Sequence, residues 1–263
     1  MKLKDRVAVV TGAASGIGKA ISLAFAEEGA KVVASDINIE GGEATVRQIK
    51  GAKGDAVFIA ADVADAEAVK NLIHETINRF GRLDIMVNNA GVEVFQRLAD
   101  TDEAVWDRVI SINLRGVFLG TKYAIPKMLE NGGGVIINMA SVAGIMGAGG
   151  LSAYNASKGG VVLLTKNTAM DYGARNIRAN CLCPGFIKTP MVEAVLSFPG
   201  AGELKGTIMD LCPAGRLGTP EEVARCAVFL ASDDSSFVNG HALVCDGGMS
   251  AGWQIDVEKA MGS

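Results

Sequence analysis

Short apolar runs alternate with amphipathic segments along nearly the whole sequence, and this order restricts the possible folds more than any other feature. The apolar runs have the length and composition of strands buried on both faces, and they cover residues 7–11, 31–36, 56–60, 83–88, 134–139, 177–183 and 241–245. Helical patterns separate them at about residues 16–28, 40–50, 65–79, 102–130, 152–172 and 220–231. Capping signals at Asp65, at Thr101 and Asp102, and at Thr219 support three of these helix starts. The order predicts an α/β fold, a Rossmann-like, doubly wound parallel sheet of about seven strands with helices on both faces.

No Pro/Ser-rich linker or block of charge divides the 263 residues, so we expect a single domain over residues 1–263. The formal net charge of -4, without a basic stripe, argues against nucleic-acid and anionic-membrane partners and favours a small-molecule ligand. Residues 131–157 carry no charge, but their glycines and polar side chains predict a strand, a loop and a helix start rather than a membrane span.

The first residues give no export signal, because the apolar run at 7–10 is too short for a signal peptide. The cysteines are odd in number and have no paired C-x-x-C spacing, which predicts reduced thiols in a cytoplasmic protein: Cys181, Cys183, Cys212, Cys226 and Cys245. His74 and His241 have no partners at ligand or triad spacing, so we expect no metal site.

A glycine-rich stretch, "TGAASGIG", follows the first predicted strand and opens the first predicted helix. By spacing alone Gly12, Gly16 and Gly18 are a weak signal, but in this position free backbone N–H groups and the helix dipole can hold a pyrophosphate. A tight strand-to-helix turn is the alternative. Asp36 ends the second predicted strand, where its carboxylate can accept both ribose hydroxyls of an adenosine or can cap the next helix.

The stretch "SAYNASKGG" places Tyr154 four residues before Lys158, so both side chains share one helix face. An ammonium about 5 Å from a phenol favours the phenolate, and we expect Lys158 to lower the pKa of Tyr154 from its usual value of about 10 toward the range of general acid/base catalysis. On these residues alone, an exposed surface pair is the alternative.

Together these motifs resemble those of the short-chain dehydrogenase/reductase family, in the family's order, from about Lys4 to Gly248. The resemblance rests on "TGAASGIG", on "DV" at Asp62 and Val63, on "NNAG" at 88–91, on "SIN" ending at Asn113, on "MASVAG", on "YNASK" and on "PGFIKT" at 184–189. The interval between Ser141 and Tyr154 is also the family's usual one.

The resemblance implies an enzyme, an oxidoreductase that transfers a hydride between NAD(H) and a secondary alcohol or ketone. Tyr154 would be the general acid and base, and Ser141 would hold the substrate oxygen. Lys158 would lower the tyrosine pKa and bind the nicotinamide ribose, while Asn113 would position a water in a proton relay.

Strand-end position and resemblance together assign the cofactor contacts to Gly12, Ser15, Gly16, Ile17, Gly18, Asp36, Ile37, Asp62, Val63, Asn89, Ala90, Gly91, Tyr154, Lys158, Pro184, Gly185, Ile187 and Thr189. Asp36 would repel the ribose phosphate of NADP. Ser15 and Ile37 stand where NADP-dependent relatives often carry a basic residue. The expected cofactor is therefore NAD.

The family places a substrate lid at about residues 186–217, and this segment is rich in apolar side chains. With the loops after two strands it offers Met191, Val192, Val195, Leu196, Phe198, Ile208, Met209, Leu211, Val92, Val94, Phe95, Ile145 and Met146. An apolar pocket favours an alicyclic or steroid-like alcohol, although these residues could instead bury the lid against the domain. The alternative functions are a 3-oxoacyl-(acyl carrier protein) reductase, a polyol or sugar dehydrogenase, and a non-catalytic NAD-binding protein.

Members of the family are usually tetramers or dimers, so the resemblance implies a homo-oligomer, with a tetramer favoured. The helices predicted near 102–130 and 152–172 would form one interface. The C-terminal tail, residues 249–263 with Trp253 and Ile255, would pack on a neighbouring subunit. Met139, Met146, Met170 and Met191 are expected in the core or in the pocket lining.

Overall fold

The apolar runs form one seven-stranded parallel sheet in the computed structural model, which describes residues 1–197 and 201–252. The strands are β1 (Val7–Thr11), β2 (Lys31–Asp36), β3 (Asp55–Ala60), β4 (Ile85–Asn88), β5 (Gly134–Met139), β6 (Ile177–Pro184) and β7 (Ala242–Cys245). Their order across the sheet is β3-β2-β1-β4-β5-β6-β7, and every neighbouring pair is parallel. The Rossmann-like, doubly wound sheet expected from the sequence is confirmed.

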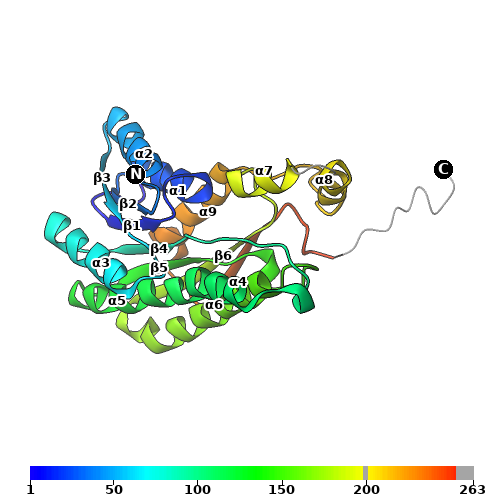
Figure 1. The fold of residues 1–263 in the computed structure, drawn as a ribbon. Coiled ribbons are helices and arrows are strands. Elements are labelled where there is room, and N and C mark those ends of the chain that lie inside the picture. The colour runs from blue at the N-terminus through cyan, green and yellow to red at the C-terminus, as the bar shows by residue number, and fades with distance from the viewer. Residues whose placement is uncertain (198–200, 253–263) are drawn as a thin grey trace.

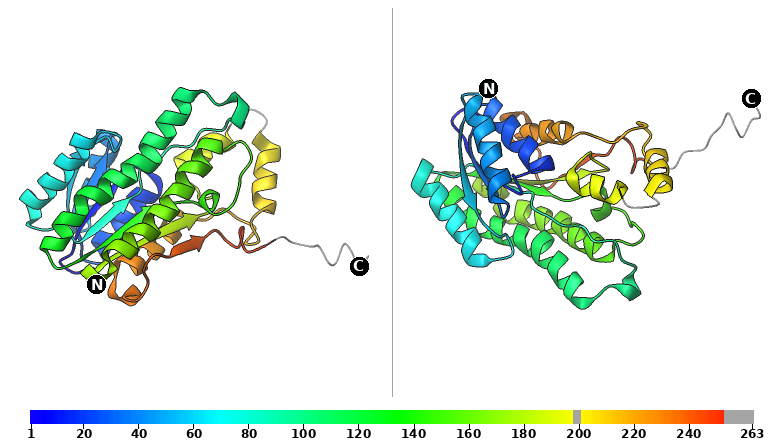
Figure 2. Two further views of the ribbon diagram at one scale, coloured as in Figure 1. Left: turned by 90° about the horizontal axis from the view of Figure 1, so that it is seen from below. Right: turned by 45° about the horizontal axis from the view of Figure 1, so that its top comes forward.

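Helices cover both faces of this sheet (Figures 1 and 2). One layer holds α1 (Gly16–Glu27), α2 (Ile39–Gly51) and α9 (Pro220–Ala231), and the other holds α3 (Ala66–Phe80), α4 (Glu103–Ile110), α5 (Gly116–Glu130) and α6 (Ser152–Tyr172). Two shorter helices, α7 (Pro190–Leu196) and α8 (Ala201–Asp210), lie beyond one end of the strands. Single 3-10 turns occur at Leu98–Asp100, Val142–Gly144, Gly173–Arg175 and Asp233–Ser235.

The central strands are buried on both faces, which explains why their sequences are continuously apolar. Successive side chains of a strand point to opposite faces of a sheet. Accordingly, Val10 and Val32 pack in the apolar layer under α1 and α9, whereas Val9 and Val33 pack in the layer under α3 and α5. The two faces of the sheet therefore pack into two separate hydrophobic cores.

The helical segment expected over residues 102–130 is present, but it is not a uniform α-helix, because a π-helical turn at Ser111–Arg115 separates α4 from α5. The wider turn contains Asn113, whose buried side chain bonds to another loop rather than to its own helix. Sequence periodicity does not distinguish this interruption, since apolar residues continue through it. π-Bulges of this kind are frequent at functional sites.

Two of the three expected capping signals act as predicted. The Asp65 carboxylate accepts hydrogen bonds from the backbone N–H groups of Glu67 and Ala68, at 2.9 and 3.4 Å. Thr219 and Glu222 form a reciprocal capping box at the start of α9. Asp102 precedes α4 but its side chain makes no capping hydrogen bond.

The uncharged segment at residues 131–157 forms β5, a 3-10 turn and the start of α6, as expected. Within the described part of the chain, no helix combines the length and apolar character needed to span a bilayer. The strand order reverses between β1 and β4, so the loops at the carboxyl ends of these strands diverge and leave a crevice.

Candidate active site

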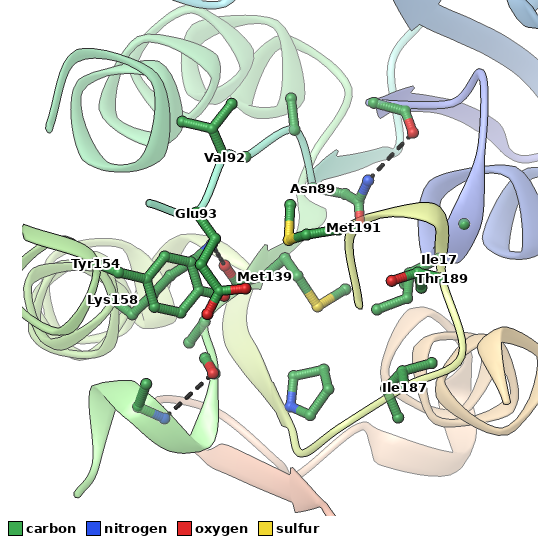
Figure 3. Close-up of a pocket in the computed structure, with 18 of the residues that line it drawn as sticks. Ile17, Asn89, Val92, Glu93, Met139, Tyr154, Lys158, Ile187, Thr189 and Met191 are labelled. Carbon is green, nitrogen blue, oxygen red and sulfur yellow. Dashed lines mark hydrogen bonds between the residues drawn. The ribbon is translucent and has the colours of Figure 1, made fainter. Parts of the chain in front are cut away.

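A cavity of about 430 Å³ lies at this crevice, lined by the loops that follow β1 to β6 and by the start of α7 (Figure 3). It brings together nearly all the residues that the sequence assigned to the site. Gly18 and Asn113 are the two assigned residues that do not line it, and both lie directly behind its wall. The chain therefore assembles one site from segments that are far apart in sequence.

The glycine loop has the shape of an anion cradle. Gly12 has a φ of +67°, and a Cβ atom there would lie 2.7 Å from Nδ2 of Asn89. A Cβ atom on Gly18 would collide with the carbonyl oxygen of Gly12. Ser15 precedes α1 without a side-chain cap, and the first turn has no acidic residue, so the backbone N–H groups of this turn stay available to a ligand. These features fit the pyrophosphate of a dinucleotide.

The carboxylate of Asp36 is fixed at the edge of the cavity by backbone donors. One oxygen accepts from the N–H of Ala14 at 3.0 Å and the other from the N–H of Asn38 at 2.9 Å. Asn38, not Asp36, caps α2, so the alternative role of Asp36 as a helix cap is wrong. Ile37 is 74% exposed and lines the cavity beside the carboxylate.

Thr11 and Asn89 join the loops that follow β1 and β4. The Thr11 hydroxyl accepts from the N–H groups of Asn89 and Ala90 at 3.0 and 3.2 Å. In return, the side-chain amide of Asn89 donates to the carbonyl of Thr11 at 2.9 Å. These reciprocal hydrogen bonds hold the loops after β1 and β4 together at the base of the crevice. Thr11 was not predicted to matter, and its position as the last residue of a buried strand was the available signal.

Tyr154 and Lys158 lie together on the opposite wall (Figure 3), and Ser141 lines the same cavity. Ser141 follows β5, while Tyr154 and Lys158 are on the same face of α6, with Nζ of Lys158 5.5 Å from the centroid of the tyrosine ring. Lys158 is 3% exposed, and its ammonium donates to the carbonyl of Met139 at 2.7 Å. The exposed surface pair, the alternative reading of this motif, is therefore wrong.

The pKa values of this pair differ from the expectation. Burial, and then the negative charge of Glu93, raise the pKa of Tyr154 above its ordinary value, while a hydrogen bond with Ser141 opposes the rise. Burial also lowers the pKa of Lys158 to about 8, against the opposing charge of Glu93. The predicted lowering of the Tyr154 pKa is wrong because it considered the ammonium charge and neglected the removal of both groups from water.

Asn113 fixes the loop that follows β4. Its side-chain oxygen accepts from the N–H of Val92 and its amide nitrogen donates to the carbonyl of Val92, both at 2.8 Å. A Cβ atom on Gly91 would lie 3.3 Å from Oδ1 of Asn113 and 3.4 Å from Nζ of Lys158. Asn113 thus lies behind the wall that carries Lys158 and holds the backbone beside Gly91 and Glu93.

Glu93 was missed by the sequence analysis, which considered only the apolar residues of "GVEVF". Its side chain lines the cavity close to Tyr154 and Lys158 (Figure 3). Burial raises the pKa of the Glu93 carboxyl, and the charge of Lys158 acts in the other direction. An acidic residue among apolar ones, directly after a strand and its glycine turn, was the signal that could have identified it.

The apolar residues expected in the substrate pocket divide into several groups. Val92, Met146, Met191 and Val192 line the cavity. Ile208 is buried, whereas Phe95, Ile145 and Leu211 are exposed and lie outside the cavity lining. The side chains of Val195 and Phe198 are outside the described part of the chain, as are Trp253 and Ile255, which were expected at a subunit interface. Further apolar lining comes from Ile112, Met139, Val142, Leu151, Phe186, Ile187 and Met249.

Met170 is not a core or pocket residue, because it is 84% exposed on α6. A metal centre is not evident among residues 1–197 and 201–252, where no three histidine, cysteine or acidic side chains come close enough to share an ion.

Comparison with known proteins adds the following. A family model described as enoyl-(acyl carrier protein) reductase matches residues 12–250, a range that includes all four predicted catalytic residues. The chain is 42% identical over 249 residues to the 3-oxoacyl-[acyl-carrier-protein] reductase FabG of Thermotoga maritima, covering 95% of this chain and 99% of that protein. It is also 42% identical over 249 residues to the cyclohexanol dehydrogenase of an Acinetobacter species, covering 94% and 95%. A crystal structure of levodione reductase matches with a TM-score of 0.93 and 40% identity, covering 95% of this chain and 100% of that one.

Proposed function

Because the chain belongs to the short-chain dehydrogenase/reductase family, we propose that it transfers a hydride between NAD(H) and a secondary alcohol or ketone, with Tyr154 as general acid and base. One observation carries this proposal. The glycine loop and Asp36 line one part of the cavity, and Ser141, Tyr154 and Lys158 line another part of the same cavity. A dinucleotide held by the first set would present its reactive ring to the second.

The nicotinamide of the bound cofactor would supply or accept the hydride. The chain's own residues would manage the proton and the charge on the substrate oxygen. Tyr154 donates a proton to a ketone oxygen or takes one from an alcohol, and the Ser141 hydroxyl holds that oxygen as charge develops. Lys158, fixed through the Met139 carbonyl, contributes a positive charge beside the tyrosine and a donor for the nicotinamide ribose.

The preference for NAD over NADP rests on Asp36. Backbone N–H groups hold both of its oxygens in place, so the carboxylate cannot easily rotate away from a ribose bound at the cavity edge. A phosphate of about -1.5 to -2 charges placed there would be repelled by several kcal/mol before solvent screening. The neighbouring residues Ser15 and Ile37 offer no cation to offset the repulsion.

An apolar alicyclic or steroid-like alcohol is the proposed substrate class. The support is the lining, in which Val92, Met139, Met146, Leu151 and Phe186 are apolar, together with a relative named cyclohexanol dehydrogenase. A second relative of equal identity is named a 3-oxoacyl-[acyl-carrier-protein] reductase, so the same experiment must include an acyl thioester.

The test follows NADH absorbance with the purified protein, NAD or NADP, and a panel of cyclic alcohols, polyols and a 3-oxoacyl thioester. We expect turnover of cyclic alcohols with NAD. Tyr154→Phe should lose at least about a thousandfold in kcat while still binding NADH, because only the ionisable oxygen is removed. Residual activity within tenfold of the wild type would exclude Tyr154 as the acid and base. Faster turnover of polyols or of the thioester would overturn the proposed substrate class.

A further inference from the structure

Glu93 is the charged side chain closest to the proposed chemistry that the mechanism does not use. It lines the cavity on the loop after β4, and its charge acts on both Tyr154 and Lys158. Figure 3 shows its carboxylate in front of the tyrosine ring. The group is therefore beside the place where a reacting oxygen would bind.

No hydrogen bond or ion pair joins the Glu93 carboxylate to another group in the part of the chain that the structure describes. Lys158 is the nearest candidate partner, but its ammonium donates to the carbonyl of Met139 and forms no salt bridge with Glu93. A carboxylate has about four acceptor positions. Glu93 is half-buried, so its carboxylate loses part of its hydration without gaining a donor from the protein, and this desolvation raises its pKa.

The backbone that carries this side chain is held in place by Asn113. The preceding residue, Val92, has both its N–H and its carbonyl bonded to Asn113, so the loop backbone cannot shift away from the cavity without breaking two hydrogen bonds. The other lining side chains around the tyrosine are mainly apolar, including Val142, Met146 and Leu151. The cavity thus presents the Glu93 carboxylate, beside Ser141 and Tyr154, among mainly apolar side chains, and a few polar groups in an apolar pocket orient a ligand.

We propose that Glu93 receives a hydrogen-bond donor of the substrate, so that the preferred substrates are cyclic secondary alcohols with a second hydroxyl or an ammonium group close to the reacting carbon. This inference rests on the proposed function. Two ligand chemistries share the required donor, a hydroxyl and an ammonium. A carboxylate or an ether oxygen at the same position would face the Glu93 oxygens with no proton between them and would be disfavoured.

The experiment compares kcat/KM for four kinds of alcohol with NAD. These are cyclohexanediols with hydroxyls on adjacent or alternate carbons, their mono-methyl ethers, the corresponding amino alcohols, and cyclohexanol. Each is measured with the wild type, Glu93→Gln and Glu93→Leu. Glu193→Gln is the matched control, because Glu193 is exposed on α7 and does not line the cavity. NADH binding, followed by its fluorescence, reports whether each variant keeps its fold and cofactor site.

The wild type should prefer a diol or an amino alcohol over the methyl ether by about tenfold to a hundredfold, the range for a hydrogen bond to a charged acceptor. Glu93→Leu should abolish or reverse this preference. Glu93→Gln should keep the preference for diols, since its amide oxygen still accepts, but lose any preference for amino alcohols. In Glu193→Gln, the ratios of kcat/KM for the diol and the amino alcohol to that for the methyl ether should equal those of the wild type.

An unchanged diol-to-ether ratio in Glu93→Leu, with cyclohexanol turnover and NADH binding intact, would overturn this inference and leave the proposed function standing. A wild type that favours the ether would do the same. If the wild type binds NADH but turns over none of the alcohols, the proposed function fails and this inference fails with it.

Discussion

Burial shifts the pKa values of Tyr154 and Lys158, the two ionisable side chains that α6 presents to the cavity, in opposite directions. It raises the pKa of Tyr154 and lowers the pKa of Lys158 to about 8, because in each case the charged form loses its hydration. The carboxylate of Glu93 adds to the first effect and opposes the second. The protonation states needed for catalysis therefore depend on a residue outside the assigned catalytic set.

This dependence predicts a pH effect. Oxidation of an alcohol needs Tyr154 to accept a proton, so kcat/KM should rise as the pH passes through the pKa of Tyr154. Glu93→Gln removes a negative charge that faces Tyr154 and Lys158, so the pKa values of both should fall and the profile should move to lower pH. The measurement is kcat/KM for cyclohexanol oxidation against pH, with Glu193→Gln as control. A profile that does not move, or that moves to higher pH, would show that the Glu93 charge does not reach the tyrosine.

Asp36 gives the second prediction at this scale. The wild type should prefer NAD to NADP by about tenfold to a hundredfold in kcat/KM, since even half of the unscreened repulsion has this effect. Asp36→Ala should narrow the ratio, and Asp36→Ala with Ile37→Arg should reverse it by adding a cation for the phosphate. Steady-state kinetics with a common alcohol measure the ratios. A wild-type ratio at or below one would mean that the carboxylate does not face the ribose.

The sequence could supply Gly12, Asp36, Ser141, Tyr154 and Lys158 because their types and spacings are themselves the signal. The sequence does not predict the pKa values of these side chains. The pKa of Tyr154 is set by burial and by Glu93, and neither follows from the four-residue spacing to Lys158. The gathering of these residues around one cavity was thus predictable, and their local electrostatics were not.

At the scale of secondary-structure elements, the start of α1 is positioned by a backbone contact that leaves no room for a side chain. Gly18→Ala would force a methyl group against the carbonyl oxygen of Gly12 and push the helix away from the loop. We expect it to weaken NADH binding at least tenfold and to lower stability, as overpacking generally does. Gly51→Ala is the matched control, because no atom lies within 4 Å of the added methyl group. This substitution should raise the stability of α2 by up to about 1 kcal/mol, since alanine favours a helix more than glycine does. Equal NADH affinity in the two variants would contradict the packing argument.

The capping box of α9 gives a prediction about stability. Thr219 accepts from the N–H of Glu222 at 3.4 Å, and the Glu222 carboxylate accepts from the N–H of Thr219 at 2.8 Å. Thr219→Ala should lower the free energy of unfolding by about 1 kcal/mol, whereas Thr219→Ser keeps the acceptor and should cost much less. Urea unfolding of the two variants measures the difference. Equal losses would assign the effect to the threonine methyl group rather than to the cap.

Strands and caps were predictable at this scale, because continuous apolar runs and residues such as Asp65 and Thr219 act locally. The π-helix at Ser111–Arg115 was not, since its cause is the pairing of Asn113 with Val92, a contact between distant segments. Helices α7 and α8 were expected only as part of the lid at about residues 186–217, without bounds of their own, because their short amphipathic patterns resemble loops.

For the whole molecule, the outer faces of α5 and α6 carry exposed apolar side chains. Phe118 is 44% exposed, Leu163 67% and Met170 84%, and the last two lie on one stripe of α6. Such exposure is unfavourable in an isolated subunit and is typical of an interaction surface. We therefore expect these helices to join copies of the chain into a dimer or tetramer.

Leu163→Glu with Met170→Glu should reduce the mass measured by light scattering after size-exclusion chromatography, because like charges would meet across the interface. Gln48→Glu is the control for added surface charge, since Gln48 is an exposed polar side chain on α2, in the other helical layer. A wild type that elutes as a monomer, or a double variant of unchanged mass, would contradict the interface.

The double hydrogen bond from Asn113 to Val92 also bears on how this protein could acquire new substrates. It ties down the backbone immediately before position 93 without involving the side chain at that position. A single codon change at Glu93 therefore exchanges the group presented to the substrate while the chain around it keeps its course. Natural or directed evolution can therefore change the side chain at position 93 and keep the loop backbone, whereas a change at Asn113 removes the hydrogen bonds that hold this backbone.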